Sequence, residues 1–153
     1  FRIADGFWID RPVIQAAHDT LKRLGIAQPK IAVSGLNPHA GEAGMFGDEE
    51  QTTIGPAIEA AQAAGIQAEG PFGADTMFAK PGYDAYIVMV HDQGHITAKL
   101  LAPNRTAGLT IGTPILFSSV AHGSALEQRV LGLGIERCRR LVEHQHERLV
   151  AHE

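Results

Sequence analysis

The stretch that decides the fold is residues 86–95, YIVMVHDQGH. Its first half, Tyr86 to Val90, is short, apolar and rich in β-branched and aromatic residues, which predicts a buried strand. The strand would carry His91 and Asp92 at its carboxyl end, before the chain turns at Gly94. Open α/β sheets bind ligands at the carboxyl ends of their strands, so this stretch outlines a functional site.

A second stretch repeats this pattern nearer the amino terminus. The run KIAVSGL at residues 30–36 predicts another buried strand, of the uninterrupted apolar kind that parallel sheets contain. It ends in a polar insert that includes His39 and Glu42. Two strands that each end in a histidine with an acidic residue nearby suggest a single cleft.

Metal binding is one use for such a cleft. Imidazole is a common ligand of Zn, Ni, Co and Fe, and a carboxylate or carbonyl usually orients its second nitrogen. His39 and His91 are therefore candidate metal ligands, although ordinary loop histidines fit the same pattern. A third ligand could be Asp75, His95 or His122, and no spacing selects among them.

An apolar stripe at helical spacing predicts an amphipathic helix before the first strand. Its members are Ile14, Ala17, Leu21 and Leu24. His18 lies off this stripe and is interpreted as a solvated helix residue rather than a ligand.

The remaining signals alternate between helix and strand, which predicts a layered α/β domain. The glycine-rich loop at residues 35–47 matches neither GxGxxG nor GxxxxGK[ST], so a tight loop is favoured over a phosphate cradle. Acidic residues 48–50 are expected to cap a helix that runs to about residue 64, and Pro56 should kink this helix or mark a restart. Further strands and a last helix are expected near residues 67–70, 108–111, 115–118 and 127–153.

Composition narrows the class of protein. The chain has 153 residues, 44% of them hydrophobic and 20% charged, which is enough for one domain with a core. The net charge of −4 argues against a nucleic-acid surface, and no apolar run approaches the roughly 20 residues of a membrane span. The single cysteine, Cys138, fits a reducing, cytoplasmic compartment. Because Phe1 stands where Met is expected, we expect the true start to be missing.

Four motifs carry a family resemblance. They are GLNPHAGE at residues 35–42, GP at 70–71 with ADT at 74–76, HDQG at 91–94 and SVAHGSA at 119–125. In their order and spacing they resemble the 4-hydroxythreonine-4-phosphate dehydrogenase family of pyridoxal phosphate biosynthesis. The resemblance covers about residues 15–126.

This resemblance implies a three-layer α/β/α fold like that of the isocitrate and isopropylmalate dehydrogenases, with the N-terminal part absent from this chain. Residues 1–126 would form the central and C-terminal α/β domain that carries the metal ligands. Residues 127–153 would form a terminal helix that packs on the missing N-terminal domain. The family usually has a glycine-containing loop after Leu126, so a deletion or a gap is expected there.

The resemblance also implies a homodimer that holds NAD and a divalent metal, whether Zn, Mg, Mn, Co or Fe, in an interdomain cleft. His39 and His91 match two of the family's three metal-ligand histidines, which come from both subunits. The third lies upstream of this chain. Lys99 matches a substrate-binding lysine of the family. Asp75 and Asp92 are expected to lie among, or next to, the side chains that surround the metal ligands. Thr110 and Gly112 are expected to contact NAD, and only their position at the end of a predicted strand supports this.

The implied reaction is the oxidation of a β-hydroxy acid by NAD followed by decarboxylation, with the metal as Lewis acid in both steps. Gly108 and Phe117 stand where members that use the phosphorylated substrate carry asparagine and arginine. A phenyl ring cannot replace the charge-assisted bonds of arginine to phosphate, which favours a cis-dihydrodiol dicarboxylate of the terephthalate type. The alternatives are 4-hydroxythreonine-4-phosphate or a related phosphorylated hydroxy acid, and a non-catalytic small-molecule-binding domain on the same scaffold.

Overall fold

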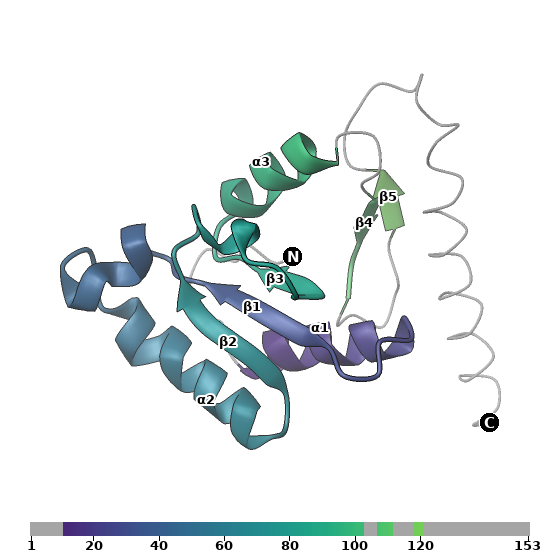
Figure 1. Cartoon of the computed structure of the whole chain (residues 1–153), viewed down its shortest axis with the longest axis horizontal. Coiled ribbons are helices and arrows are strands. Elements are labelled where there is room, and N and C mark those ends of the chain that lie inside the picture. The colour runs from purple at the N-terminus through teal and green to yellow at the C-terminus, as the bar shows by residue number, and fades with distance from the viewer. Residues whose placement is uncertain (1–10, 103–106, 112–117, 121–153) are drawn as a thin grey trace. The chain divides into compact units, whose positions relative to one another are not determined.

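The structure, a computed structural model, describes residues 11–102, 107–111 and 118–120 (Figure 1). The chain divides into two compact units, with the boundary between Thr97 and Ala98. The first unit contains a parallel sheet and the helices that pack on it.

This sheet has three parallel strands, β1 (Lys30–Ser34), β2 (Gln67–Phe72) and β3 (Ala85–Ile87), in the order β2-β1-β3. β1 lies in the centre, and Ile31, Ala32 and Val33 are fully buried there. A continuous apolar run is what a strand covered on both faces needs. The predicted α/β architecture with a parallel sheet is confirmed.

β3 is shorter than predicted. The apolar run continues to Val90, but the backbone N–H groups of Met89 and Val90 donate to the side chain of Gln93. Helix α3 (His91–Leu101) follows at once. The predicted turn at Gly94 is therefore wrong, because Gly94 lies in the first part of this helix.

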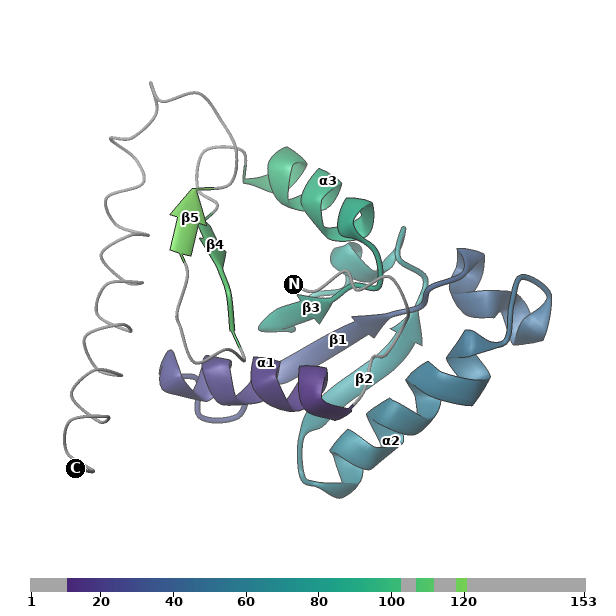
Figure 2. The same cartoon turned by 180° about the vertical axis from the view of Figure 1, so that it is seen from behind.

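Two helices, α1 (Arg11–Arg23) and α2 (Gly55–Ala63), pack on the face of the sheet to which Ile31 belongs (Figure 2). Ile14 from α1 and Ile58 from α2 are buried in the same apolar cluster as Ile31. This cluster is the core of the first unit.

The predicted stripe of α1 holds for three of its four members. Ile14 is fully buried, and Ala17 and Leu21 pack against the core. Leu24 is 48% exposed and lies one residue beyond the end of α1 at Arg23, where the chain turns away at Gly25 with a φ of 95°.

Pro56 marks the restart of the regular helix, which is one of the two outcomes predicted for it. A wide turn of the π type, η2 (Glu50–Ile54), leads into α2, and Pro56 lies in the first turn of the regular helix. Proline has no N–H to donate to the preceding turn, so the regular hydrogen-bond ladder can begin only around it.

The opposite face of the sheet carries aromatic side chains. Ala32 lies between Glu69 of β2 and Tyr86 of β3. The hydroxyl of Tyr83 donates to the carboxylate of Glu69 over 2.5 Å, and its ring lies 6.0 Å from that of Tyr86. A short turn, η3 (Met77–Ala79), contributes further to this side through Phe78, whose ring is 5.1 Å from Tyr86.

In the second unit, β4 (Ala107–Leu109) and β5 (Ser118–Val120) pair antiparallel. β4 agrees with the predicted strand at 108–111, whereas β5 begins only at the last residue of the predicted strand at 115–118. The expected helix at 127–153 and the expected boundary at residue 126 lie outside the described residues. Among the described helices, none is long and apolar enough to cross a membrane.

Candidate active site

The two histidine-bearing segments leave the sheet at the same edge. β1 and β3 are parallel neighbours, and Val33 pairs with Ile87 near their carboxyl ends. The segment after β1 carries His39 and the segment after β3 carries His91. Figure 1 shows β1 and β3 running in the same direction, so both segments begin at the edge where α/β proteins bind ligands.

The segment after β1 forms a left-handed turn, η1 (Pro38–Gly44). His39, Ala40, Glu42 and Ala43 all have φ between 42° and 58°. In this conformation the β-carbon crowds the following carbonyl oxygen, which costs about 1–2 kcal/mol per residue. Strain of this kind persists only where surrounding groups hold it.

The buried carboxylate of Glu50 binds the backbone that leads into this turn. Glu50 is only 5% exposed, and its Oε1 accepts the backbone N–H groups of Leu36 and Asn37, each at 2.8 Å. Its Oε2 accepts the side-chain N–H of Asn37 at 2.9 Å. The sequence predicted that residues 48–50 cap the next helix. Glu50 instead folds back and binds the segment that follows β1.

These hydrogen bonds also set the charge of Glu50. Burial alone raises the pKa of this carboxyl, but the hydrogen bonds from the side chain and backbone of Asn37 and the backbone of Leu36 outweigh it. The pKa therefore lies below its ordinary value of 4.5. Glu50 is ionised at neutral pH, and its bonds to the segment are charge-assisted.

The glycine-rich loop is a tight loop, as predicted. A β-carbon on Gly35 would lie 2.8 Å from Oε1 of Glu50, and one on Gly41 would lie 2.6 Å from Oε2. The loop thus closes around this carboxylate, and the N–H groups of Leu36 and Asn37 are already paired with it. A protein carboxylate takes the place that a phosphate would need.

Gln93 joins the two strand ends. Its Oε1 accepts the backbone N–H groups of Met89 and Val90 at 2.8 and 3.2 Å. Its Nε2 donates to the carbonyl oxygen of Gly35 at 3.2 Å, and Ser34 Oγ lies 3.3 Å from its Oε1. Both ends of one amide are therefore used: Oε1 accepts from the link after β3 and from Ser34, and Nε2 donates to Gly35 just after β1.

His91 lies at the first position of α3, with its side chain 55% exposed. Its Nδ1 is 2.8 Å from the carboxylate of Asp92. With Nδ1 protonated toward Asp92, Nε2 carries the lone pair that a metal ion requires. The predicted pairing of this histidine with a neighbouring acid is present.

His95 stacks on His91. The two rings are 7° from parallel, with centroids 4.1 Å apart. A metal ion lies in the plane of each imidazole that binds it, and one ion cannot lie in two parallel planes separated by this distance. In this arrangement His95 is therefore not a co-ligand of His91, although the sequence left it open.

Gly73 lies close to both Asp75 and His39. His39 is exposed, and its ring lies 6.0 Å from that of Phe46. A β-carbon placed on Gly73 would lie 2.8 Å from Oδ1 of Asp75 and 3.9 Å from Cα of His39. The loop after β2 therefore runs beside the left-handed turn and presents Asp75 near it.

The remaining predicted residues belong to other parts of the chain. Lys99 is exposed in the last turn of α3, and Thr110 follows β4 with its side chain partly buried. Gly112 and His122 lie outside the described residues. Within the described ranges, no group of three His, Cys, Asp or Glu side chains is placed to hold a metal ion.

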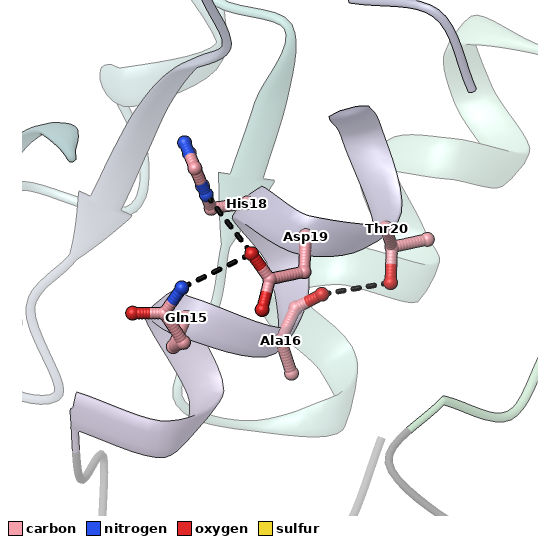
Figure 3. A network of polar contacts seen from close by, with 5 residues as sticks. All are labelled: Gln15, Ala16, His18, Asp19 and Thr20. Atoms are coloured by element: carbon pink, nitrogen blue, oxygen red, sulfur yellow. Dashed lines mark hydrogen bonds and ion pairs between the residues drawn. The ribbon is translucent and has the colours of Figure 1, made fainter. Parts of the chain in front are cut away.

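His18 provides a reference for the two site histidines. Figure 3 shows it on α1 beside Asp19, which also accepts the side-chain N–H of Gln15. The His18 Nδ1 is 3.2 Å from the Asp19 carboxylate, and its side chain is 17% exposed. It is less solvated than predicted. Its place on α1 also differs from that of His39 and His91, which both follow strands.

Comparison with known proteins identifies the family. The family model described as pyridoxal phosphate biosynthetic protein PdxA matches residues 11–138. This chain belongs to the PdxA family. The resemblance that the four motifs indicated is confirmed, and the mixed helix and parallel-sheet fold is that of a PdxA protein.

Three relatives of this PdxA-family chain illustrate its range. The 1,2-dihydroxy-3,5-cyclohexadiene-1,4-dicarboxylate dehydrogenase of Comamonas sp is 45% identical over 80% of this chain and 38% of that protein. The D-threonate 4-phosphate dehydrogenase of Cupriavidus necator is 46% identical over 85% of this chain and 40% of that protein. The crystal structure of 4-hydroxythreonine-4-phosphate dehydrogenase from Klebsiella pneumoniae superimposes with a TM-score of 0.68 at 44% identity, covering 75% of this chain and 36% of that one.

This PdxA-family chain spans about two fifths of the length of those relatives. All three are named dehydrogenases, and their names differ in substrate. The family is therefore fixed by comparison, whereas the substrate is not.

Proposed function

We propose that a full-length protein carrying this chain is a metal- and NAD-dependent dehydrogenase that oxidises a β-hydroxy acid and then decarboxylates it. One observation carries this proposal: His39 and His91 follow neighbouring parallel strands of a PdxA-family chain and leave the sheet at the same edge. We also propose that the whole protein has the layered fold of the isocitrate and isopropylmalate dehydrogenases.

In this proposal His39 and His91 bind a divalent metal. The donor set fits, because both side chains are exposed and Asp92 orients the ring of His91 through Nδ1. Two imidazoles are too few for a metal site, so the remaining ligands come from outside the described residues, including a second subunit of a homodimer. When bound, the metal lowers the pKa of the substrate hydroxyl and polarises the ketone that forms.

Other side chains complete the proposed site. Lys99 supplies positive charge to an acidic substrate, and Asp75 approaches the metal region beside His39. Thr110, which follows β4, and Gly112 contact NAD in this proposal. The buried Glu50 keeps the backbone of the His39 segment in its left-handed form.

The substrate is proposed to be a cis-dihydrodiol dicarboxylate of the terephthalate type. Overall identity does not decide this, since relatives that differ in named substrate are 45% and 46% identical to this chain. Phe117 and Gly108 support it, because neither can make the charge-assisted bonds that hold a phosphate. A phosphorylated hydroxy acid is the second candidate, since D-threonate 4-phosphate is named for a relative at that identity.

An NADH assay of the full-length protein tests the proposal. With a divalent metal present, NADH should form with the dihydrodiol dicarboxylate, accompanied by CO2, and should not form with a phosphorylated hydroxy acid. The variant Phe117→Arg should lower turnover of the dicarboxylate. Turnover confined to the phosphorylated compound would refute the substrate, and the absence of any metal-dependent NADH formation would refute the dehydrogenase itself.

A further inference from the structure

Gln93 has more partners than a helix residue needs. A glutamine at the third position of a helix commonly accepts the N–H of the residue that precedes the helix, and the bond from Val90 is of this kind. The additional bonds to Met89, Ser34 and Gly35 go beyond capping. The bonds to Gly35 and Ser34 connect residues that are 58 and 59 positions apart in the sequence.

The bond to Gly35 has a direct consequence for the other segment. Gly35 immediately precedes Leu36 and Asn37, the two residues whose N–H groups Glu50 accepts. Its own N–H donates to the carbonyl of Phe72 in β2. The backbone just before His39 is therefore held by β2, by Glu50 and by Gln93.

The bonds to Met89 and Val90 have the same consequence for His91. These residues form the short irregular link between β3 and α3, where no strand partner takes their N–H groups. Their position depends on the amide of Gln93, and His91 is the next residue along the chain.

We propose that Gln93 is a positioning residue that fixes the separation of the His39 and His91 segments. The amide donates to the carbonyl of Gly35 on one side and accepts from the link before His91 on the other. One side chain therefore sets the positions of both segments. The inference rests on the proposed function in taking the two histidines as metal ligands.

Metal affinity is the first test, with Co²⁺ as the probe and the full-length protein as the sample. The variant Gln93→Ala should weaken Co²⁺ binding by about 10–100-fold, as the loss of a group that orients ligands does, and should change the visible absorption bands of bound Co²⁺. The matched control is Gln62→Ala. It removes a glutamine hydrogen bond to the backbone carbonyl of Ala68 at 2.7 Å, as Gln93→Ala removes the one to the carbonyl of Gly35, but it lies far from both histidines in the sequence.

Gln62→Ala should lower only the thermal midpoint and leave Co²⁺ binding and its spectrum unchanged. Equal Co²⁺ affinities and spectra in the two variants would overturn the role of Gln93. A wild-type protein that bound no Co²⁺ would refute the metal site in the proposed function, and a second measurement then decides the role of Gln93.

That measurement is amide hydrogen exchange at Leu36 and Asn37 without metal. In Gln93→Ala these amides should exchange faster than in wild type, although neither contacts Gln93 directly, and in Gln62→Ala they should not. Gln93→Glu serves if the alanine variant fails to fold, because it keeps an acceptor for Met89 and Val90 and removes the donor to Gly35. Unchanged exchange at Leu36 and Asn37 in the variant that folds would overturn the proposal.

Discussion

The two histidine-bearing segments begin side by side and differ in almost everything else. The segment after β1 is a left-handed turn in which His39 has a φ of 54°. The segment after β3 enters a regular helix at once, with His91 at its first position. The first conformation opposes the intrinsic preference of L-residues, whereas the second follows it. The difference teaches that one histidine is placed by tertiary contacts and the other mainly by local helix formation.

The means of stabilisation differ in the same way. The backbone that leads into the left-handed turn is held by Glu50, a buried charge that comes from the beginning of η2. The start of α3 is held by Gln93, a neutral amide within the helix itself. A charged acceptor shared by two backbone N–H groups stabilises the backbone more strongly than a neutral amide does. Its loss leaves those N–H groups without a partner.

The largest expected effect therefore comes from Glu50→Ala. Removing the carboxylate leaves the N–H groups of Leu36 and Asn37 unpaired, and we expect the free energy of unfolding to fall by about 3 kcal/mol or more. Urea unfolding of the full-length protein measures this. Glu59→Ala, an exposed glutamate of α2, is the control and should change the same free energy by less than about 0.5 kcal/mol. Similar losses in both variants would contradict the hold that Glu50 exerts.

The pH dependence of the protein's stability gives a second test of Glu50. Because its pKa in the folded protein lies below the ordinary value of 4.5, its contribution to stability is present above that value. The contribution is lost as the pH falls through the folded pKa. Glu50→Gln, which carries no ionisable group there, should therefore flatten the fall in stability below pH 4.5. An unchanged slope would show that Glu50 is not among the groups responsible.

Glycine substitutions of two alanines test the left-handed turn itself, and their smaller effects on the free energy of unfolding should have opposite signs. Ala43→Gly should stabilise the protein by roughly 0.5 kcal/mol, because relief of a φ of 58° exceeds the added chain entropy of glycine. Ala60→Gly, in the right-handed α2, should destabilise by about 1 kcal/mol. Urea unfolding of both variants gives the two signs. Destabilisation by Ala43→Gly as large as that by Ala60→Gly would contradict the strain.

The comparison also explains what the sequence could predict. The strands were recognisable because Ile31 to Val33 and Tyr86 to Met89 are short apolar runs bounded by polar residues. Since parallel strands end at one edge, the closeness of the His39 and His91 segments followed from the strand assignment. The restart of the helix at Pro56 was recognisable because only proline lacks the N–H that a helix needs.

The supporting residues were harder to find because they act over long separations in the sequence. Glu50 lies 14 residues from Leu36, and as part of an acidic run it resembled a helix cap. Gln93 lies 58 residues from Gly35, and the only local signal was a glutamine three residues after the end of the apolar run. The left-handed turn also left no clear trace, because His39, Ala40, Glu42 and Ala43 are not residues that favour positive φ as glycine does. Hydrogen-bond partners of this kind appear only when the chain is folded.

The most direct test of the central claim is NADH formation by the full-length protein as a function of added divalent metal, measured for His39→Ala, His91→Ala and His18→Ala. His18 is the matched control, because its Nδ1 also lies beside the carboxylate of the next residue, at 3.2 Å against 2.8 Å for His91. We predict that wild type and His18→Ala form NADH only when metal is added, and that His39→Ala and His91→Ala form none at any metal concentration. Metal-dependent turnover retained in either of the last two variants would contradict the assignment of His39 and His91 as the ligands.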